Sequence, residues 1–213
     1  MINSSTYPNV RRLICVAGPP CSGKTFALRA LQKGENPQLS AILGITDPQS
    51  WLAFAPGWLP PECPPELDRA FFHYDILRIW KFGGQGGQFA KDRALHLLAE
   101  CESLEFVTLL TTTDTLRQRF AARPMLKMMA RTLIRPGEFM KMMVCYFRMH
   151  KLYRAPEMLS ELYTEWFEFT GQFNPKAHYV VDSSDGYSAV DVEEMVRYLS
   201  SEKRPQKNQV SGI

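Results

Sequence analysis

The sequence lacks a long hydrophobic run. No stretch of 18 apolar residues occurs among its 213 residues, so we expect no membrane-spanning helix and no membrane partner. Residues 1–12 contain no apolar run behind a basic patch, which is unlike a secretory signal peptide. We therefore expect a cytoplasmic protein.

Cysteine is scarce, and excess charge of either sign is small. The five cysteines are widely scattered and include no Cys-x-x-Cys pair, which argues against a disulfide framework or a zinc site. The 25 Lys and Arg against 22 Asp and Glu give a net charge of +3, too little to indicate a nucleic-acid partner by itself. With 45% hydrophobic and 22% charged residues, the composition is typical of one globular domain.

Short apolar runs alternate with helix-like segments along most of the chain. The runs predict strands at 11–17, 70–75, 105–111 and 177–182, with a possible fifth strand between Leu39 and Ile45. The intervening patterns predict helices at 24–33, 89–101, 115–123 and 189–199, the third capped by Asp114. Strands that alternate with helices predict a three-layer α/β fold, with a parallel sheet flanked by helices on both faces.

One domain is predicted over residues 11–200. Residues 125–170 are helical in pattern and predict a lid-like insertion into this domain. The polar segments 1–10 and 201–213 predict a flexible N-terminus and a disordered tail. Residues 37–68 combine prolines with aromatics, which indicates a short helix and a long Pro-rich loop.

One motif carries specific chemistry. Residues 18–25 fit GxxxxGK[ST] in full, directly after a predicted strand and directly before a predicted helix. Its glycines let the backbone curl so that successive amides and the helix N-terminus point at one anion. Lys24 would reach the β- and γ-phosphates, and the Thr25 hydroxyl would ligate Mg²⁺. The predicted nucleotide-binding residues are Gly18, Pro19, Pro20, Cys21, Ser22, Gly23, Lys24 and Thr25.

Through this octet the chain resembles the P-loop nucleoside-triphosphate-binding superfamily, which implies binding of ATP or GTP with Mg²⁺. The order of its segments is similar to that of the small P-loop kinases, which phosphorylate nucleotides, nucleosides or other small metabolites. Residues 107–123 are similar to the strand and arginine-bearing lid entry of these enzymes. The resemblance implies a phosphotransferase with an unidentified small-molecule acceptor, in which Arg119 and Arg123 clamp the transferred phosphoryl group.

An acidic residue ends the second predicted strand. Ligands bind at the carboxyl edge of such sheets, so Asp75 is a candidate to hold Mg²⁺ or to accept a proton from the acceptor hydroxyl. The alternative is that Asp75 only caps the following turn. His73 points to the same face of the strand, and for it a packing role is favoured. Arg78 either reaches a substrate phosphate or covers the sheet edge.

Two other functions stay open. Residues 73–78, HYDILR, behind such a loop also resemble sulfotransferase-like proteins, which bind a phosphoadenosine donor but usually lack the GK[ST] ending that this chain keeps. A nucleotide-dependent switch or hydrolase that serves a protein partner would be favoured by a strand ending in DE or DxxG, which we do not find. The kinase reading is preferred over both.

Basic residues and methionines concentrate in residues 117–154. Ten lysines and arginines stand there against the single acid Glu138, so the segment carries +9 and the rest of the chain −6. Seven of the ten methionines lie in it as well. This composition predicts a basic, mobile helical lid over the phosphates. A helical pair with a Met-rich buried face is the alternative, and a nucleic-acid partner is the least favoured. The glycine-rich residues 83–87 are either a gate or a plain connector.

Overall fold

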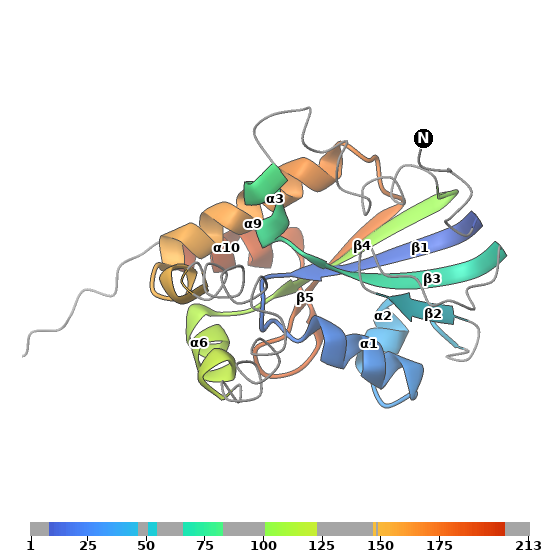
Figure 1. The fold of residues 1–213 in the computed structure, drawn as a ribbon, viewed down its shortest axis with the longest axis horizontal. Coiled ribbons are helices and arrows are strands. Elements are labelled where there is room, and N and C mark those ends of the chain that lie inside the picture. Colours follow the sequence, from blue (N-terminus) through green and yellow to red (C-terminus); the bar gives the residue numbers. More distant parts are fainter. Residues whose placement is uncertain are drawn as a thin grey trace, which may run out of the picture.

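The computed structural model describes residues 9–46, 51–54, 66–82, 101–122, 147 and 149–202, and within them a single sheet crosses the molecule (Figure 1). Its six strands lie in the order β2-β3-β1-β4-β5-β6. They are β1 (Asn9–Gly18), β2 (Trp51–Phe54), β3 (Glu66–Asp75), β4 (Ser103–Leu110), β5 (Ala177–Asp182) and β6 (Ser188–Ala189). All neighbours are parallel except β5 and β6, which are antiparallel. The predicted α/β class is confirmed, with a mixed rather than purely parallel sheet.

Helices cover both faces of the sheet. Figure 1 shows α1 (Lys24–Gln32) and α2 (Pro37–Ile42) on one side, and α3 (Leu77–Phe82), α9 (Pro156–Gly171) and α10 (Val192–Glu202) on the other. Strand β1 divides its side chains between the two layers: Ile14 and Val16 belong to the cluster with α1 and α2, whereas Leu13 and its alternate neighbours belong to the cluster with α9. A strand buried on both faces is therefore apolar throughout, which is why the sequence shows it as a continuous run.

The larger core is built around the indole of Trp166 on α9. This side chain is fully buried and stacks on Tyr74 of β3 with ring centroids 5.4 Å apart. Its Nε1 donates to Thr108 Oγ1 of β4 at 2.7 Å, so the polar edge of the ring is satisfied inside the core. Helix α9 is therefore part of the domain core, although it lies within the predicted lid-like insertion at 125–170.

The remainder of that predicted insertion divides in two. Residues 123–146 lie outside the described residues, as do residues 89–100 of the helix predicted at 89–101 and the 83–87 loop. In the described part that follows, Met149, Leu152 and Tyr153 are buried and belong to the larger core. The C-terminal end of the predicted basic lid therefore belongs to the larger core.

The prediction of a possible strand between Leu39 and Ile45 is wrong. This stretch contains α2, whose N-cap Asn36 accepts a hydrogen bond from the Leu39 amide at 3.1 Å, with Pro37 in the first turn. An Asn-Pro pair is a helix-start signal, and it overrides the short apolar pattern that follows it. The additional strand is β2, at the sheet edge beside β3.

Two helix starts also differ from the prediction. Helix α6 (Thr113–Ala121) is capped by Thr112, whose hydroxyl accepts from the Thr115 amide, while Asp114 lies in the first turn. Asp114 therefore interacts favourably with the positive end of the helix dipole, but it is not the N-cap. The final helix, α10, begins at Val192 instead of residue 189, because residues 188–189 pair with β5 and Asp191 accepts from the Glu194 amide.

The ends of the described fold extend slightly past the predicted domain. Strand β1 begins at Asn9 and buries Val10, and α10 ends at Glu202. Residues 1–8 and 203–213 lie outside the described residues. No helix in the described ranges has both the length and the apolar character needed to cross a membrane.

Candidate functional site

The central strands place the glycine-rich octet beside Asp75. Strands β1 and β3 pair in parallel with Gly18 opposite Asp75 and Val16 opposite His73. The Ile76 amide continues this pairing by donating to the Gly18 carbonyl at 3.2 Å. Because parallel strands end at the same edge of a sheet, residues 57 positions apart become neighbours. The octet, residues 18–25, is called the 18–25 loop below.

The 18–25 loop curls through two left-handed residues before α1 begins. Cys21 has φ 68° and Gly23 has φ 97°. Gly23 is the N-cap of α1 and provides no side-chain hydrogen bond to it. The first turn of a helix has no acceptors of its own for its amides, so α1 presents an uncapped, electropositive end at this edge of the sheet.

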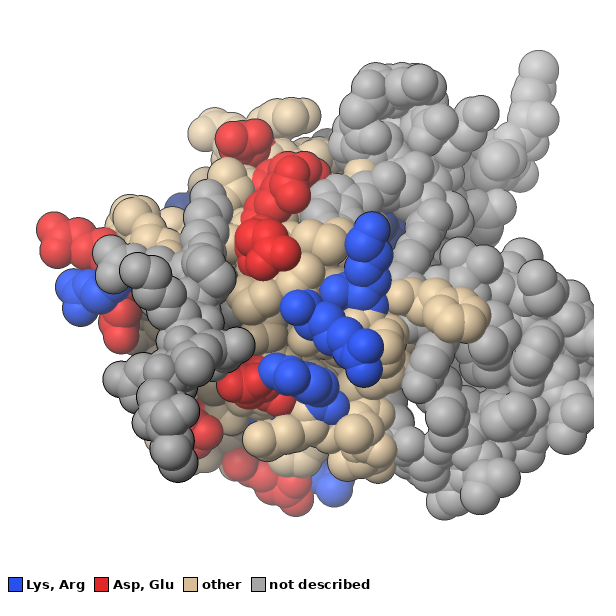
Figure 2. All heavy atoms as spheres, turned by 90° about the vertical axis from the view of Figure 1, so that its left-hand side faces the viewer, with Lys and Arg blue, Asp and Glu red and all other residues tan. Residues whose placement is uncertain are grey.

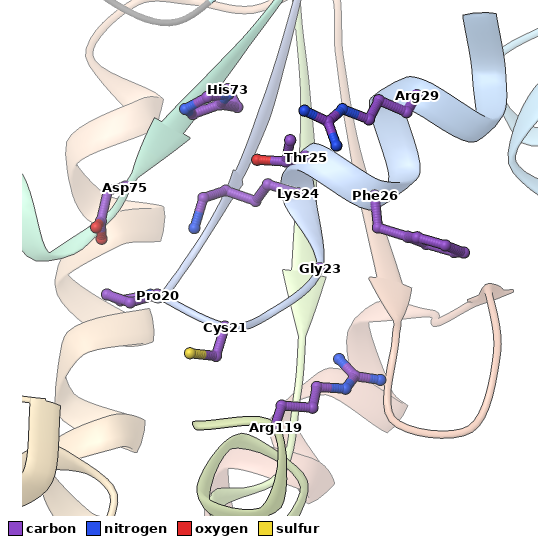
Figure 3. Close-up of a pocket in the computed structure, with 10 residues that line it drawn as sticks. All are labelled: Pro20, Cys21, Gly23, Lys24, Thr25, Phe26, Arg29, His73, Asp75 and Arg119. Carbon is purple, nitrogen blue, oxygen red and sulfur yellow. The ribbon is translucent and has the colours of Figure 1, made fainter. Parts of the chain in front are cut away.

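The Lys24 ammonium holds the start of the loop. Its Nζ donates to the carbonyl oxygens of Gly18 and Pro19 at 2.8 and 2.7 Å, and the residue is only 8% exposed. In Figure 3 the Lys24 side chain points to the side of the pocket where Asp75 lies. A phosphate entering this pocket would compete with the two carbonyls for the same charge.

Side chains from distant parts of the chain bind the other carbonyls of the loop. The Tyr153 hydroxyl donates to the Pro20 carbonyl. Arg119 Nη1 and Ser183 Oγ donate to the Ser22 carbonyl at 3.3 and 3.1 Å. With the Lys24 bonds, the carbonyls of four loop residues are bound by side chains. Four carbonyls of the loop are therefore paired with donors and are not left as free acceptors beside the cavity.

Arg119 links the 18–25 loop to the segment that follows β5. Besides the Ser22 carbonyl, its guanidinium donates to the carbonyls of Ser183 and Ser184. Three backbone acceptors thus fix its orientation. Its predicted role as a phosphoryl clamp stays a prediction, whereas its contacts here are those of a residue that positions the loop.

A cavity of about 510 Å³ opens over this loop. Figure 3 shows its lining, with His73 and Asp75 at one end, Phe26 at the other and Lys24 between them. Among the described residues, Lys24, Arg29 and Arg119 make the lining predominantly basic against the one carboxylate of Asp75. The described residues that line the cavity are Pro20, Cys21, Gly23, Lys24, Thr25, Phe26, Arg29, His73, Asp75 and Arg119.

The carboxylate of Asp75 both binds a nearby backbone amide and lines the cavity. Its Oδ1 accepts from the Leu77 amide at 3.1 Å, as expected of a residue that caps the turn into α3. The same side chain lines the cavity. Capping one amide uses one lone pair of a group that has about four, so the cap leaves acceptor capacity for a ligand.

His73 also faces this cavity, in contrast to the packing role favoured for it. It is partly buried, and burial lowers its pKa. The nearby Lys24 charge lowers this pKa further, and Asp75 opposes both effects. Burial and the Lys24 charge therefore favour the neutral form of the imidazole. Only the pairing of β1 with β3 reveals that this position lies beside the loop.

The oxygen donors that could hold a divalent cation come from both sides of the loop. The Thr25 hydroxyl and the Asp75 carboxylate line the same cavity. In the described part of the chain there is no group of three or more His, Cys, Asp or Glu side chains that could hold a metal. Two hard oxygen donors fit Mg²⁺, which usually takes its other ligands from phosphates and water.

Two described arginines near the predicted site, Arg117 and Arg78, do not line the cavity. Arg117 pairs with Asp114 on the exposed surface of α6. The Arg78 guanidinium lies over the Tyr74 ring, 5.6 Å from its centroid, and is absent from the lining. Arg123 lies outside the described residues. From the predicted set, the structure brings seven residues to the cavity: Pro20, Cys21, Gly23, Lys24, Thr25, Asp75 and Arg119.

Phe26 and Arg29 line the cavity but were not anticipated. Both are exposed residues of α1, directly after the motif. Arg29 stands four residues after Thr25, a spacing that puts both on one helix face and would have indicated its place.

The wider surface around the site carries charge of both signs. Figure 2 views the side of the molecule on which α6 lies, and it shows Lys and Arg side chains close together near the middle of the described surface. Asp and Glu side chains lie around them in the same view. Basic character is thus local, in keeping with a chain whose overall charge is only +3.

Comparisons with protein-family models, curated proteins and solved structures find no match to this chain. What this site does must therefore be inferred from its own chemistry.

Proposed function

We propose that this protein binds ATP or GTP with Mg²⁺ over the 18–25 loop and transfers the terminal phosphoryl group to a small-molecule acceptor. The observation that carries the proposal is how the 18–25 loop and the start of α1 are arranged beside the cavity. Four of the loop's carbonyls are bound by side chains, and the uncapped N-terminus of α1 borders a basic cavity that Lys24 also lines. The positive end of a helix together with a lysine suits the binding of a polyphosphate.

The metal would be held between the phosphates and two side chains. Thr25 and Asp75 supply hard oxygens on the same cavity, and Mg²⁺ would neutralise charge on the phosphates. In the transfer step, the bond between the terminal phosphorus and its bridging oxygen breaks as the acceptor oxygen bonds to that phosphorus. The nucleoside diphosphate leaves, and the acceptor proton passes to a base. Asp75 is the candidate for this base, since it is the one carboxylate among the described residues of the lining.

A neutral His73 beside Asp75 favours phosphoryl transfer further. An imidazole without charge does not compete with Lys24 for the phosphates, and it can accept or donate a hydrogen bond to an acceptor hydroxyl. The acceptor side of the cavity is therefore the end where His73 and Asp75 lie.

The test is a thermal-shift panel with Mg²⁺ and one of three ligands: ATP, GTP or phosphoadenosine phosphosulfate. A ligand present at 100 times its dissociation constant adds about 2.7 kcal/mol of stability. We expect the triphosphates to raise the melting temperature of the wild-type protein and to have little effect on Lys24→Ala. Because Lys24 also supports two loop carbonyls, the melting temperature of the variant without ligand is its own reference.

A larger shift with the sulfonyl donor than with ATP would overturn phosphoryl transfer in favour of the sulfotransferase-like alternative. No shift with any of the three ligands would remove nucleotide binding altogether. Release of inorganic phosphate that rises only when a protein partner is added would instead favour the switch or hydrolase alternative.

A further inference from the structure

We propose that Phe26 stacks on the nucleoside of the bound nucleotide, so that the base lies at the Phe26 end of the cavity and the terminal phosphate at the Asp75 end. This inference rests on the proposed function and adds which side chain recognises the non-phosphate part of the ligand. It begins with the exposure of this ring.

Phe26 is 69% exposed, whereas the rings that build the core, such as Trp166 and Tyr74, are fully buried. Among the described side chains, the other exposed large hydrophobics are Phe147, Val192 and Val196, and none of these lines the cavity. A single exposed apolar residue is ordinary in itself. An exposed aromatic ring in the wall of a basic cavity is different, because a flat ligand group held there would remove it from water.

The position of Phe26 relative to the loop sets the direction of the ligand. Lys24, Thr25 and Phe26 are successive residues of the first turn of α1. Figure 3 shows the Phe26 ring directed away from Asp75 and His73, with Lys24 between the two ends. A nucleoside triphosphate is a linear chain of phosphates with the nucleoside at one end. If its terminal phosphate lies near Lys24 and Asp75, its nucleoside must emerge at the opposite end.

A second flat group borders that end of the cavity. A Cβ placed on Gly23 would lie 3.8 Å from Arg119 Nη1 and 3.7 Å from Tyr187 Oη, so both groups stand directly beside the loop. Three backbone carbonyls fix the edges of the Arg119 guanidinium. A planar cation held in place and an exposed aromatic ring are the surfaces on which bases stack.

Stacking of this kind uses the face of the base and not its hydrogen-bonding edge. Every nucleobase has such a face, so the Phe26 contribution is expected to be similar for adenine and guanine. Inorganic tripolyphosphate, which has no nucleoside, cannot use it. This difference separates the effect of Phe26 from that of the phosphate-binding loop.

The experiment measures the dissociation constants of ATP, GTP and tripolyphosphate, each with Mg²⁺, by titration calorimetry on the full chain. Phe26→Ala is expected to raise the dissociation constants of ATP and GTP by about tenfold or more. The dissociation constant of tripolyphosphate should stay within about twofold of the wild-type value. Phe26→Tyr keeps a ring and is expected to bind nucleotides like the wild-type protein. Val192→Ala removes an exposed apolar side chain elsewhere and is the matched control.

The outcomes separate this inference from the proposed function. If the wild-type protein binds neither nucleotide nor tripolyphosphate, the proposed function fails and the inference fails with it. The wild-type protein could instead bind them while Phe26→Ala lowers the affinity for nucleotide and tripolyphosphate equally, or changes neither affinity. Either result would overturn the stacking role alone. Because Phe26 is exposed, its replacement should not disturb folding, and circular dichroism of the variant checks this point.

Discussion

At the scale of single residues, Gly18 shows how closely the loop packs on the sheet. A Cβ at this position would lie 2.5 Å from Ser22 Oγ and 3.2 Å from the Leu109 carbonyl. Gly18→Ala should therefore displace the loop, destabilise the fold by about 1–3 kcal/mol and weaken ATP binding. Urea unfolding and calorimetry measure the two effects.

Gly171 provides the matched control for this substitution. Among the described residues, no heavy atom beyond its own helix backbone and chain neighbours lies within 4 Å of a Cβ built on it, and it ends helix α9. Gly171→Ala should leave ATP binding unchanged and stability the same or slightly higher. Equal effects of the two substitutions would contradict the close approach at Gly18.

Replacing one carboxylate oxygen of Asp75 with an amide nitrogen can separate its capping role from its role as a base or metal ligand. In Asp75→Asn the amide oxygen can still accept from the Leu77 amide, so the turn into α3 should persist. The amide cannot serve as a base and is a weaker metal ligand. We expect nucleotide binding to remain and turnover, measured as phosphate released from ATP, to fall by about a hundredfold or more. Unchanged turnover would show that Asp75 is only a cap.

At the scale of elements, a polar network joins α9, β4 and β5 inside the larger core. His178 Nε2 shares a hydrogen bond with Thr108 Oγ1 at 2.8 Å, and the same hydroxyl receives the Trp166 indole at 2.7 Å. The His178 ring also packs against Phe106 and Phe167. Burial in these surroundings lowers the pKa of His178 to about 4 from 6.5.

This network predicts a loss of stability in acid. A histidine whose folded pKa lies below its unfolded pKa contributes stability that is complete above about pH 6.5 and is lost as the pH falls to about 4. Between pH 7 and 4.5 the loss should be about 2–3 kcal/mol. His178→Gln, which cannot titrate, should therefore show a shallower fall in the free energy of unfolding than the wild-type protein. His150→Gln is the control, and identical pH profiles for wild type and His178→Gln would refute the assignment.

At the scale of the whole molecule, the uneven distribution of charge leads to the remaining prediction. Residues 117–154 carry +9 against −6 for the rest of the chain. Their described ends, in α6 and in residues 149–153, pack on the larger core, where Phe120 is partly buried and Leu152 is fully buried. The lid predicted from the sequence is thereby restricted to residues between these ends, most of which lie outside the described part.

Hydrogen exchange tests that prediction. Peptides from residues 123–148 should exchange readily in the free protein and gain protection when a non-hydrolysable ATP analogue and Mg²⁺ are added. Peptides from α9 should be strongly protected in both states, because the buried face of this helix forms the centre of the larger core. Strong, equal protection of residues 123–148 in both states would mean ordinary core packing instead of a lid.

The amino-acid sequence by itself determined the features that depend on short stretches of chain. The apolar runs predicted β1, β3, β4 and β5, and the octet at 18–25 predicted a tight turn into α1. Such features are local because strand burial, helix initiation and glycine conformations depend mainly on neighbouring residues. Between Leu39 and Ile45 the apolar pattern favoured a strand, whereas Asn36 and Pro37 favoured the start of a helix. The prediction followed the apolar pattern and was wrong.

Only the tertiary structure decided which distant residues meet at the cavity. The alternation of the run put His73 on the same face as Asp75, but only the strand order placed both residues beside the 18–25 loop. Tyr153 reaches the Pro20 carbonyl across 133 positions of chain, a contact that depends on how the following helix packs. The exposure of Phe26 likewise depends on which face of α1 the sheet covers. Contacts between residues far apart in sequence follow from the packing of whole elements, and no local pattern encodes them.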